Sequence, residues 1–516
     1  MKIKTFILFL AFTLCYGKAF SAGEVETSMS PIEWDVSFTG VGSSGRWAPY
    51  FIGSNSGGRH AMKGSADISG LIRKDFDLDR RFSWTAGVEL SASYASSAMY
   101  DRYIPEENVW TSRAWHPSRA TIYQLWAGAK YRGINIWVGM RDHQSLMVDG
   151  ELSSGDLTLS NNARAIPQVE IGFVDFQNIP LTKGWVQIMG GISYGKFTDN
   201  GSIKGRYNYW NGHIALGTLF TYKYVYFRSR QDKPFTVMIG VQAAGEFGGT
   251  TYGYVNGREF RVTKNRQDLR AFWEMIIPTK RFSDGFVEGN HVGTWNFQGR
   301  YKFRTGYMVE GYFQWHWDDG SAMAKRNHWD GLWGISLTFP QNFRPVRKLL
   351  IEYIDMRDQS GPIHWAPYDA PGTTIVSEAS GGDNYYNSSS FNGWANYGLG
   401  LGSPFPLAPL YNADGYPQYK HTRTHGVHIA ATGNIIPALA WTAKFSYGIA
   451  RGNGRIPYPY TLKNTSAQIA ADWDAACLVE GLRLNAALAF DAGTLRGDNF
   501  GGLVKVSYYG NFNINK

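Results

Sequence analysis

Hydrophobic and polar residues alternate along several segments of the chain, and this period of two predicts β-strands. The clearest segment is FSWTAGVELSASY, residues 82–94. Its even-numbered positions from Trp84 to Tyr94 are apolar, and its odd-numbered positions from Ser83 are Ser, Thr, Gly or Glu. Residues 134–141 and 235–243 repeat the pattern. Alternation alone leaves two architectures open, because a two-sheet sandwich and a membrane barrel both need strands with two different faces.

Short and long connections alternate between these segments, and this second pattern favours a barrel. The short connections lie near residues 132–133, 228–234, 304–306, 341–345 and 434–437, and the long ones near 95–120, 143–167, 248–291, 318–330, 357–423 and 451–465. Outer-membrane barrels have tight periplasmic turns and longer outside loops. We therefore predict an all-β transmembrane barrel with about 18 antiparallel strands between Trp34 and Gly510, both termini in the periplasm, and a lumen closed by extracellular loops.

The N-terminus has the pattern of a secretory signal peptide. Two lysines precede an apolar run at residues 6–16, which is too short to span a membrane, and small residues follow it. Such a peptide exports the chain, and the predicted barrel then indicates the outer membrane of a Gram-negative cell as its location. We predict a signal peptide at residues 1–22 and a single barrel domain at residues 23–516, whose longest extracellular loop covers about residues 357–423.

Composition narrows the class of protein further. Aromatic residues make up 16% of the chain and there are 60 glycines, yet the mean hydropathy is −0.31, which is unusual for a soluble core. Removal of the three lysines of the signal peptide lowers the formal net charge from +9 to +6. These charges are scattered without basic blocks, so nucleic acid is not an expected partner. The mature chain keeps one cysteine, Cys477, and therefore forms no internal disulfide.

Five separated motifs, in a fixed order, resemble a known family. They are LSSGDLTLSNNARAIPQVEIGF (152–173), HWDGLWGISL (328–337), IEYIDMRDQSGPIH (351–364), GGDNYYN (381–387) and AFDAGTLRGDNFGGLVKVSYY (489–509). The family is that of the outer-membrane capsule assembly protein Wzi. The resemblance implies an 18-stranded barrel that acts as a lectin and holds newly exported capsular polysaccharide at the cell surface. It implies neither the export channel nor an enzyme.

One segment of the longest loop carries the candidate binding chemistry. GGDNYYNSSSFNGW, residues 381–394, has no strand period and combines flat rings with amide side chains. Aromatic faces stack on the C–H face of a sugar, and Asn and Asp side chains pair with hydroxyls. An alternative is structural: the glycine, Asn and Asp residues form tight turns while the rings pack as the core of a folded loop. The glycan-binding candidates are Asp383, Asn384, Tyr385, Tyr386, Asn387 and Trp394.

Arg357 and Trp365, at the start of the same loop, complete the candidate set. An unpaired Arg357 would suit an acidic polysaccharide. The alternative is an ion pair between Arg357 and Asp358 inside the lumen, where a charge is tolerated only if it is paired or hydrated. The pairing of Arg357 therefore distinguishes a receptor for the polymer from an anchor for the loop.

Two other functions compete with the lectin. A barrel of this size can serve as a diffusion channel for small solutes, and loops that leave the lumen open would indicate one. An enzyme would need a catalytic motif, but the chain contains no G-x-S-x-G and no H-E-x-x-H. A cluster of acid–base or metal-ligating residues is conceivable at His316, Asp318, Asp319, His328 and Asp330, although the neighbouring Trp315 and Trp317 are typical of a membrane-interface girdle.

Together these observations predict a monomeric, non-enzymatic lectin. Its expected partners are capsular or extracellular polysaccharide and outer-membrane lipid. A polymer presents many copies of one epitope, so weak sites on many barrels can hold one chain through avidity. No cofactor and no metal are needed for that role.

Overall fold

The computed structural model of the chain describes residues 30–117, 120–278, 287–318, 322–342, 344–361, 364–365, 379–380 and 382–512, with only the backbone at 364–365 and 379–380. The predicted signal peptide lies outside the described residues and stays a prediction.

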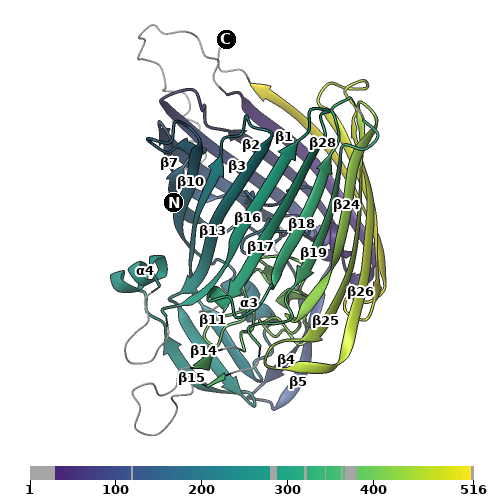
Figure 1. Cartoon of the computed structure of the whole chain (residues 1–516). Coiled ribbons are helices and arrows are strands. Elements are labelled where there is room, and N and C mark those ends of the chain that lie inside the picture. Colours follow the sequence, from purple (N-terminus) through teal and green to yellow (C-terminus); the bar gives the residue numbers. More distant parts are fainter. Residues whose placement is uncertain are drawn as a thin grey trace, which may run out of the picture.

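A closed antiparallel barrel dominates the fold, as predicted (Figure 1). The barrel strands pair in sequence order, and β8 and β9 share one position because both pair with β10, which makes 18 positions. The last strand pairs with the first from Phe512 and Ile32 to Gly501 and Ser43, so the sheet has no free edge. The strands are β1 (Ile32–Trp47), β2 (Met62–Lys74), β3 (Phe82–Ala95), β6 (Ala120–Tyr131), β7 (Ile134–Met140), β8 (Gln168–Phe173), β9 (Gln177–Asn178), β10 (Val186–Lys196), β12 (Leu219–Ser229), β13 (Phe235–Phe247), β16 (Asn290–Lys302), β17 (Met308–Asp318), β18 (Gly331–Thr338), β19 (Lys348–Asp355), β24 (Thr424–Ile436), β25 (Leu439–Gly452), β26 (Pro457–Asp474), β27 (Leu482–Gly493) and β28 (Asn499–Phe512).

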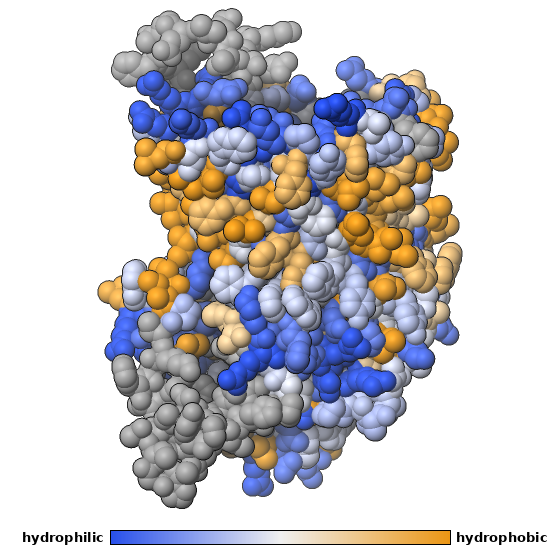
Figure 2. Space-filling model, in the orientation of Figure 1, coloured by the Kyte–Doolittle hydropathy of each residue, from blue (hydrophilic) through white to orange (hydrophobic). Residues whose placement is uncertain are grey.

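The two faces of the strands differ as a membrane barrel requires. On β3, Ser83 and Thr85 point inward and are buried, while Leu90 points outward and is 52% exposed. Ile136 and Ile239 are exposed in the same way on β7 and β13. Figure 2 shows the result on one face of the barrel as an apolar band across its middle, with hydrophilic surface toward both ends. The outer surface is therefore suited to lipid and the inner surface to polar contacts.

The two ends of the barrel are unequal. At one end, called the short-turn end, lie tight connections such as residues 132–133 and 437–438 and both ends of the described chain. The opposite end, called the long-loop end, carries every other element (Figure 1). These are α2 (Tyr50–Gly53), β4 (Ala98–Ile104), β5 (Val109–Trp115), α3 (Asn200–Arg206), β11 (Gly212–Leu216), β14 (Thr250–Val255), β15 (Arg258–Lys264), α4 (Leu269–Ile276), β20 (His364–Trp365), β21 (Ala379–Ser380), β22 (Ala395–Asn396), β23 (Leu399–Gly400) and η1 (Pro409–Tyr411). In outer-membrane barrels the short-turn end faces the periplasm.

Among the described residues, no helix is long and apolar enough to cross a membrane.

Candidate functional site

The loop between β7 and β8 folds into the barrel. Asp156 lies near its centre and accepts hydrogen bonds from the side-chain amides of Gln242 on β13 and Gln314 on β17, each at 2.8 Å. Farther along the wall, Glu352 on β19 accepts from the Ser153 hydroxyl at 2.6 Å and from the Ser154 N–H at 2.7 Å. The polar inner face of the barrel thus binds the loop at several points.

A second segment, from the loop between β19 and β24, packs against the first. Trp394 Nε1 donates to the Thr158 carbonyl at 2.9 Å, and the Tyr386 hydroxyl donates to the Leu157 carbonyl at 2.5 Å. Asn162 Nδ2 donates back to the Gly400 carbonyl at 2.9 Å. We call residues 141–167 and 382–423 together the plug. Its apolar side chains form one continuous cluster with those of the wall, so the lumen is filled rather than open.

The six candidates predicted in residues 383–394 all lie within the plug. Tyr385 and Trp394 are 0% exposed and Tyr386 is 1% exposed, while Asp383 and Asn387 are also buried and Asn384 is half-buried. Asn387 exchanges two hydrogen bonds with the Tyr419 backbone, at 2.8 and 2.9 Å. The protein itself therefore occupies much of the pairing capacity of these side chains. Contact between them and a glycan stays a prediction, and it requires the segment to leave the lumen.

Arg357 is paired, but with a different residue from the one expected. Its guanidinium holds Asp355 through Nε to Oδ1 at 2.8 Å and Nη2 to Oδ2 at 2.5 Å. Asp358 instead lies 3.7 Å from the His328 ring. The expected pair with Asp358 is wrong because the Arg357 side chain turns back to Asp355 at the end of β19, whereas the Asp358 carboxylate faces His328. The side chain of Trp365 lies outside the described residues.

Asp330 holds residues 358 and 359, which precede the plug's second segment in the same loop and contact its start through the Asp383 N–H and the Gln359 carbonyl. It is 3% exposed, and its carboxylate accepts the backbone N–H of Gln359 at 2.8 Å and of Asp358 at 3.2 Å. Burial raises the pKa of Asp330 to about 7, and the two N–H groups only partly oppose the shift. The charge of this carboxyl group therefore changes near neutral pH.

Sequence reasoning missed an aromatic surface at the long-loop end. Tyr103 on β4 lies 5.6 Å from Trp110 on β5 and 4.5 Å from Trp210, measured between ring centroids. The two tryptophan rings are 5.5 Å apart, and the Arg102 guanidinium lies 4.6 Å from the centre of the Tyr209 ring. We call these five residues the tip cluster. Trp110 is 49% exposed, so a flat ring faces outward.

Three loops hold the tip cluster together. The Tyr103 N–H donates to the Asn208 carbonyl at 2.8 Å, and the Gly257 N–H donates to the Trp210 carbonyl at 2.9 Å. Gly257 has φ +77°, and a Cβ there would lie 1.9 Å from Tyr103 Cε1, so only glycine fits. The loops after β3, β10 and β13 thus form one surface, although they are far apart in sequence.

The chemistry of the tip cluster suits a sugar ring. An exposed tryptophan offers a face for stacking, and Asn108, Asn211 and Asn256 are exposed beside it. Asn108 Oδ1 accepts from the Tyr103 hydroxyl and Asn211 Oδ1 from the Asn256 N–H, each at 2.7 Å, so these two residues offer their amide NH2 groups to sugar hydroxyls. The tripeptides at 108–110 and 208–210 share the spacing Asn-x-Trp, which is a possible sequence signal. The same spacing at 135–137 lies on a barrel strand, so the signal is not specific.

The conceivable acid–base cluster does not assemble as a metal site. Among the described residues, no group of three or more His, Cys, Asp or Glu side chains is arranged to hold a metal ion. His316 is fully buried and packs against Tyr385 and Tyr386, whereas the side chain of His328 is 76% exposed. Asp319 lies outside the described residues.

Comparison with known proteins identifies the fold of the chain but not its family. No protein-family model matches the chain, and no curated protein matches its sequence. Among solved structures, the chain is similar to Wzi of Escherichia coli, described as an outer membrane protein involved in group 1 capsule assembly and a carbohydrate-binding β-barrel. The TM-score is 0.54 at 13% identity, over 92% of this chain and 83% of that one.

Two other barrels match less well. Acinetobacter baumannii OccAB2 has a TM-score of 0.45 at 10% identity, over 94% of this chain and all (100%) of that one. Pseudomonas aeruginosa OprD has a TM-score of 0.44 at 8% identity, over 96% and 100%. The closed sheet of 18 strand positions, with its apolar outer face, defines the class as an outer-membrane β-barrel. Within that class the chain has a Wzi-like fold.

Proposed function

We propose that the protein is a surface lectin of the Wzi kind, which holds capsular or extracellular polysaccharide at the outer membrane. The observation that carries this proposal is the plug. Two loop segments fill the lumen and hydrogen-bond to its wall, and the long-loop end presents an aromatic surface instead of a pore. A barrel built in this way is better suited to binding a ligand outside than to passing one through.

The diffusion channel is the main alternative, and it would require the plug to move. The buried carboxylates Asp156 and Glu352 would then lose the hydrogen bonds described above, and each unpaired buried group costs about 1–3 kcal/mol or more. The polar lining that a porin offers to water is here used to bind its own loops. The plug therefore argues for the lectin.

The tip cluster supplies the proposed contact surface. Trp110 would stack on a sugar ring, with Arg102 beside it to attract an acidic polymer. A single site of this size binds weakly, but a polymer that spans many barrels multiplies the contacts. The side chains predicted in residues 383–394 lie in the plug and not in this surface. Their direct contact with glycan belongs to the proposal only for a state in which the plug has opened.

The first test compares cells that produce the polysaccharide with and without this protein. Cell-bound and medium-released polymer are measured at equal total synthesis. We expect deletion to shift polymer from the cells to the medium, and expression of the natural protein to reverse the shift. The double variant Trp110→Ala, Trp210→Ala should not reverse it.

A matched control is Trp185→Ala, which removes an equally exposed ring (54%) at the short-turn end. This variant should retain polymer like the natural protein. Unchanged retention after deletion would contradict the proposal. In that case, solute flux through the purified barrel in liposomes would test the channel.

A further inference from the structure

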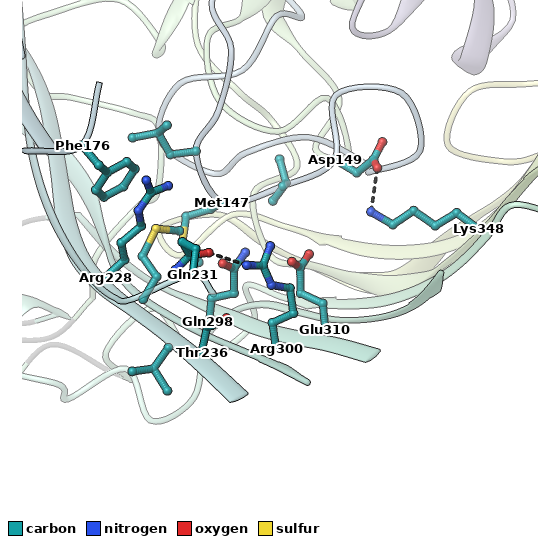
Figure 3. Close-up of a pocket in the computed structure, with 14 residues that line it drawn as sticks. Met147, Asp149, Phe176, Arg228, Gln231, Thr236, Gln298, Arg300, Glu310 and Lys348 are labelled. Atoms are coloured by element: carbon teal, nitrogen blue, oxygen red, sulfur yellow. Dashed lines mark hydrogen bonds and ion pairs between the residues drawn. The ribbon is translucent and has the colours of Figure 1, made fainter. Parts of the chain in front are cut away.

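A cavity of about 280 Å3 lies at the short-turn end of the barrel, opposite the tip cluster (Figure 3). Its wall consists of the ends of β12, β13, β16, β17 and β19, and residues 146–149 of the plug form its inner side. The charged side chains that line it are half-buried, so solvent reaches them. In an outer-membrane barrel this end faces the periplasm.

Two arginines in this cavity are held in place by neutral groups. Arg228 donates from Nε to Gln187 Oε1 at 2.7 Å, and its guanidinium lies 3.8 Å from the centre of the Phe176 ring. Arg300 donates from Nη2 to the side-chain oxygen of Gln231. Within the described part of the chain, neither guanidinium forms an ion pair with a carboxylate. Both therefore keep N–H donors for a ligand.

The charges of the lining leave one positive charge uncompensated. Lys348 pairs with Asp149 at 2.8 Å, and this pair is neutral overall. Glu310 on β17 balances one of the two arginines. In Figure 3, Arg228 and Arg300 both extend toward the segment that carries Met147, with Gln231 between them. Asp175, next to Phe176 and outside the lining, acts on Arg228 electrostatically and offsets part of this charge without forming an ion pair with it. The cavity therefore favours an anion of low charge over a multiply charged one.

We infer that this cavity binds a single carboxylated sugar unit from the periplasmic side. A guanidinium pairs with either a carboxylate or a phosphate through two parallel hydrogen bonds. A carboxylate carries a single negative charge and a phosphate about −1.5 to −2, so the low net charge of this lining favours the carboxylate. Thr236 and Gln298 supply a hydroxyl and an amide for ring hydroxyls. The volume is just below the range of about 300–1,000 Å3 typical of ligand pockets, so it admits about one ring.

Calorimetric titration of the purified full-length barrel with glucuronate tests this site. At low ionic strength we expect saturable binding that weakens as salt is added. Arg228→Gln and Arg300→Gln should each weaken it at least about tenfold, because each removes a charged hydrogen-bond donor pair. Arg300→Lys keeps the charge but loses the paired geometry, so it should also weaken binding.

Arg230→Gln is the matched control. Arg230 lies on the same turn, pairs with Asp232 at 2.7 Å and does not line the cavity, so this variant should bind glucuronate normally. Resistance of the barrel to unfolding in detergent verifies that each variant is folded. Four results would overturn the inference: no binding of glucuronate, equal binding of glucose, equal binding of acetate, or tighter binding of inorganic phosphate. The outcome is independent of the retention experiment, which concerns the opposite end.

Discussion

The plug and the tip cluster contain the same kinds of side chain and use them in opposite ways. Trp394 in the plug is fully buried and donates to a backbone carbonyl, whereas Trp110 in the tip cluster is 49% exposed. Asn387 gives both sides of its amide to the Tyr419 backbone, whereas Asn108 is exposed and gives only its Oδ1 atom, which accepts from the Tyr103 hydroxyl at 2.7 Å. Rings and amides together are therefore not sufficient for a glycan site. They must also be left unused by the protein.

The largest expected effect is that of Trp394→Ala on the plug. The change removes a buried ring that stacks on Phe220 and leaves the Thr158 carbonyl without its donor. We expect a loss of about 3–5 kcal/mol in the local stability of the plug. Faster protease cleavage within residues 382–423, and ion conductance in a planar bilayer, would measure it. Intact protection would show that the plug does not depend on this ring.

Gly257→Ala should disrupt the tip cluster without touching the plug. The positive φ costs about 1–2 kcal/mol for a residue with a Cβ, and the contact with Tyr103 adds to it. We expect the loops to separate, so that binding of purified polysaccharide falls at least as far as in Trp110→Ala. Gly497→Ala is the control, since Gly497 also has a positive φ (+78°) but nothing within 4 Å of an added Cβ. Equal loss in both variants would assign the effect to backbone strain alone.

Trp110→Ala should separate binding from stability. An exposed ring contributes little to folding, so the free energy of unfolding should change by less than about 0.5 kcal/mol. Loss of the stacking face should weaken polysaccharide binding about tenfold. A binding assay with the purified barrel, together with thermal unfolding, gives both values. If Trp110→Ala destabilised the barrel as much as Trp394→Ala, both rings would serve stability, and the contrast between the tip cluster and the plug would be wrong.

The smallest expected effect is on the pH dependence of residues 358–359, which contact the start of the plug's second segment. The folded pKa of Asp330, about 7, is above its ordinary value, so the folded protein binds more protons than the unfolded chain between about pH 4 and 7. Local stability is therefore full below pH 4 and falls as pH rises through 7. Hydrogen exchange at the Gln359 amide, corrected for intrinsic rate, should show about tenfold less protection at pH 8 than at pH 6. Asp330→Asn should abolish the difference, and its persistence would assign it to another group.

Sequence patterns predicted the barrel because membrane strands obey local rules. The alternation in residues 82–94 appears in β3 as buried Ser83 and Thr85 opposite exposed Leu90. Long loops also predicted that the lumen is closed. The partner of Arg357 could not be predicted correctly, because two carboxylates lie within two residues of it and its side chain turns back to Asp355 at the end of β19.

The positions of the rings could not be predicted from sequence either. Asn-x-Trp occurs at 108–110 in the tip cluster and at 392–394 in the plug with the same local chemistry. Whether such a ring is buried depends on its contacts with other loops. Trp394 packs against the loop that contains Thr158, whereas Trp110 faces solvent. The cavity at the short-turn end likewise joins Arg228, Arg300 and Lys348 from strands that no motif links.

The sequence by itself therefore determined the class of fold, the two faces of its strands and the inequality of its two ends. These properties follow from local periodicity and loop length, which a membrane barrel must satisfy strand by strand. Only the tertiary structure decided which polar and aromatic groups remain available to a ligand. A side chain can bind a ligand only if it is not already paired within the protein. Buried polar groups pair with residues that are distant in sequence, so the tertiary structure decides which side chains remain unpaired.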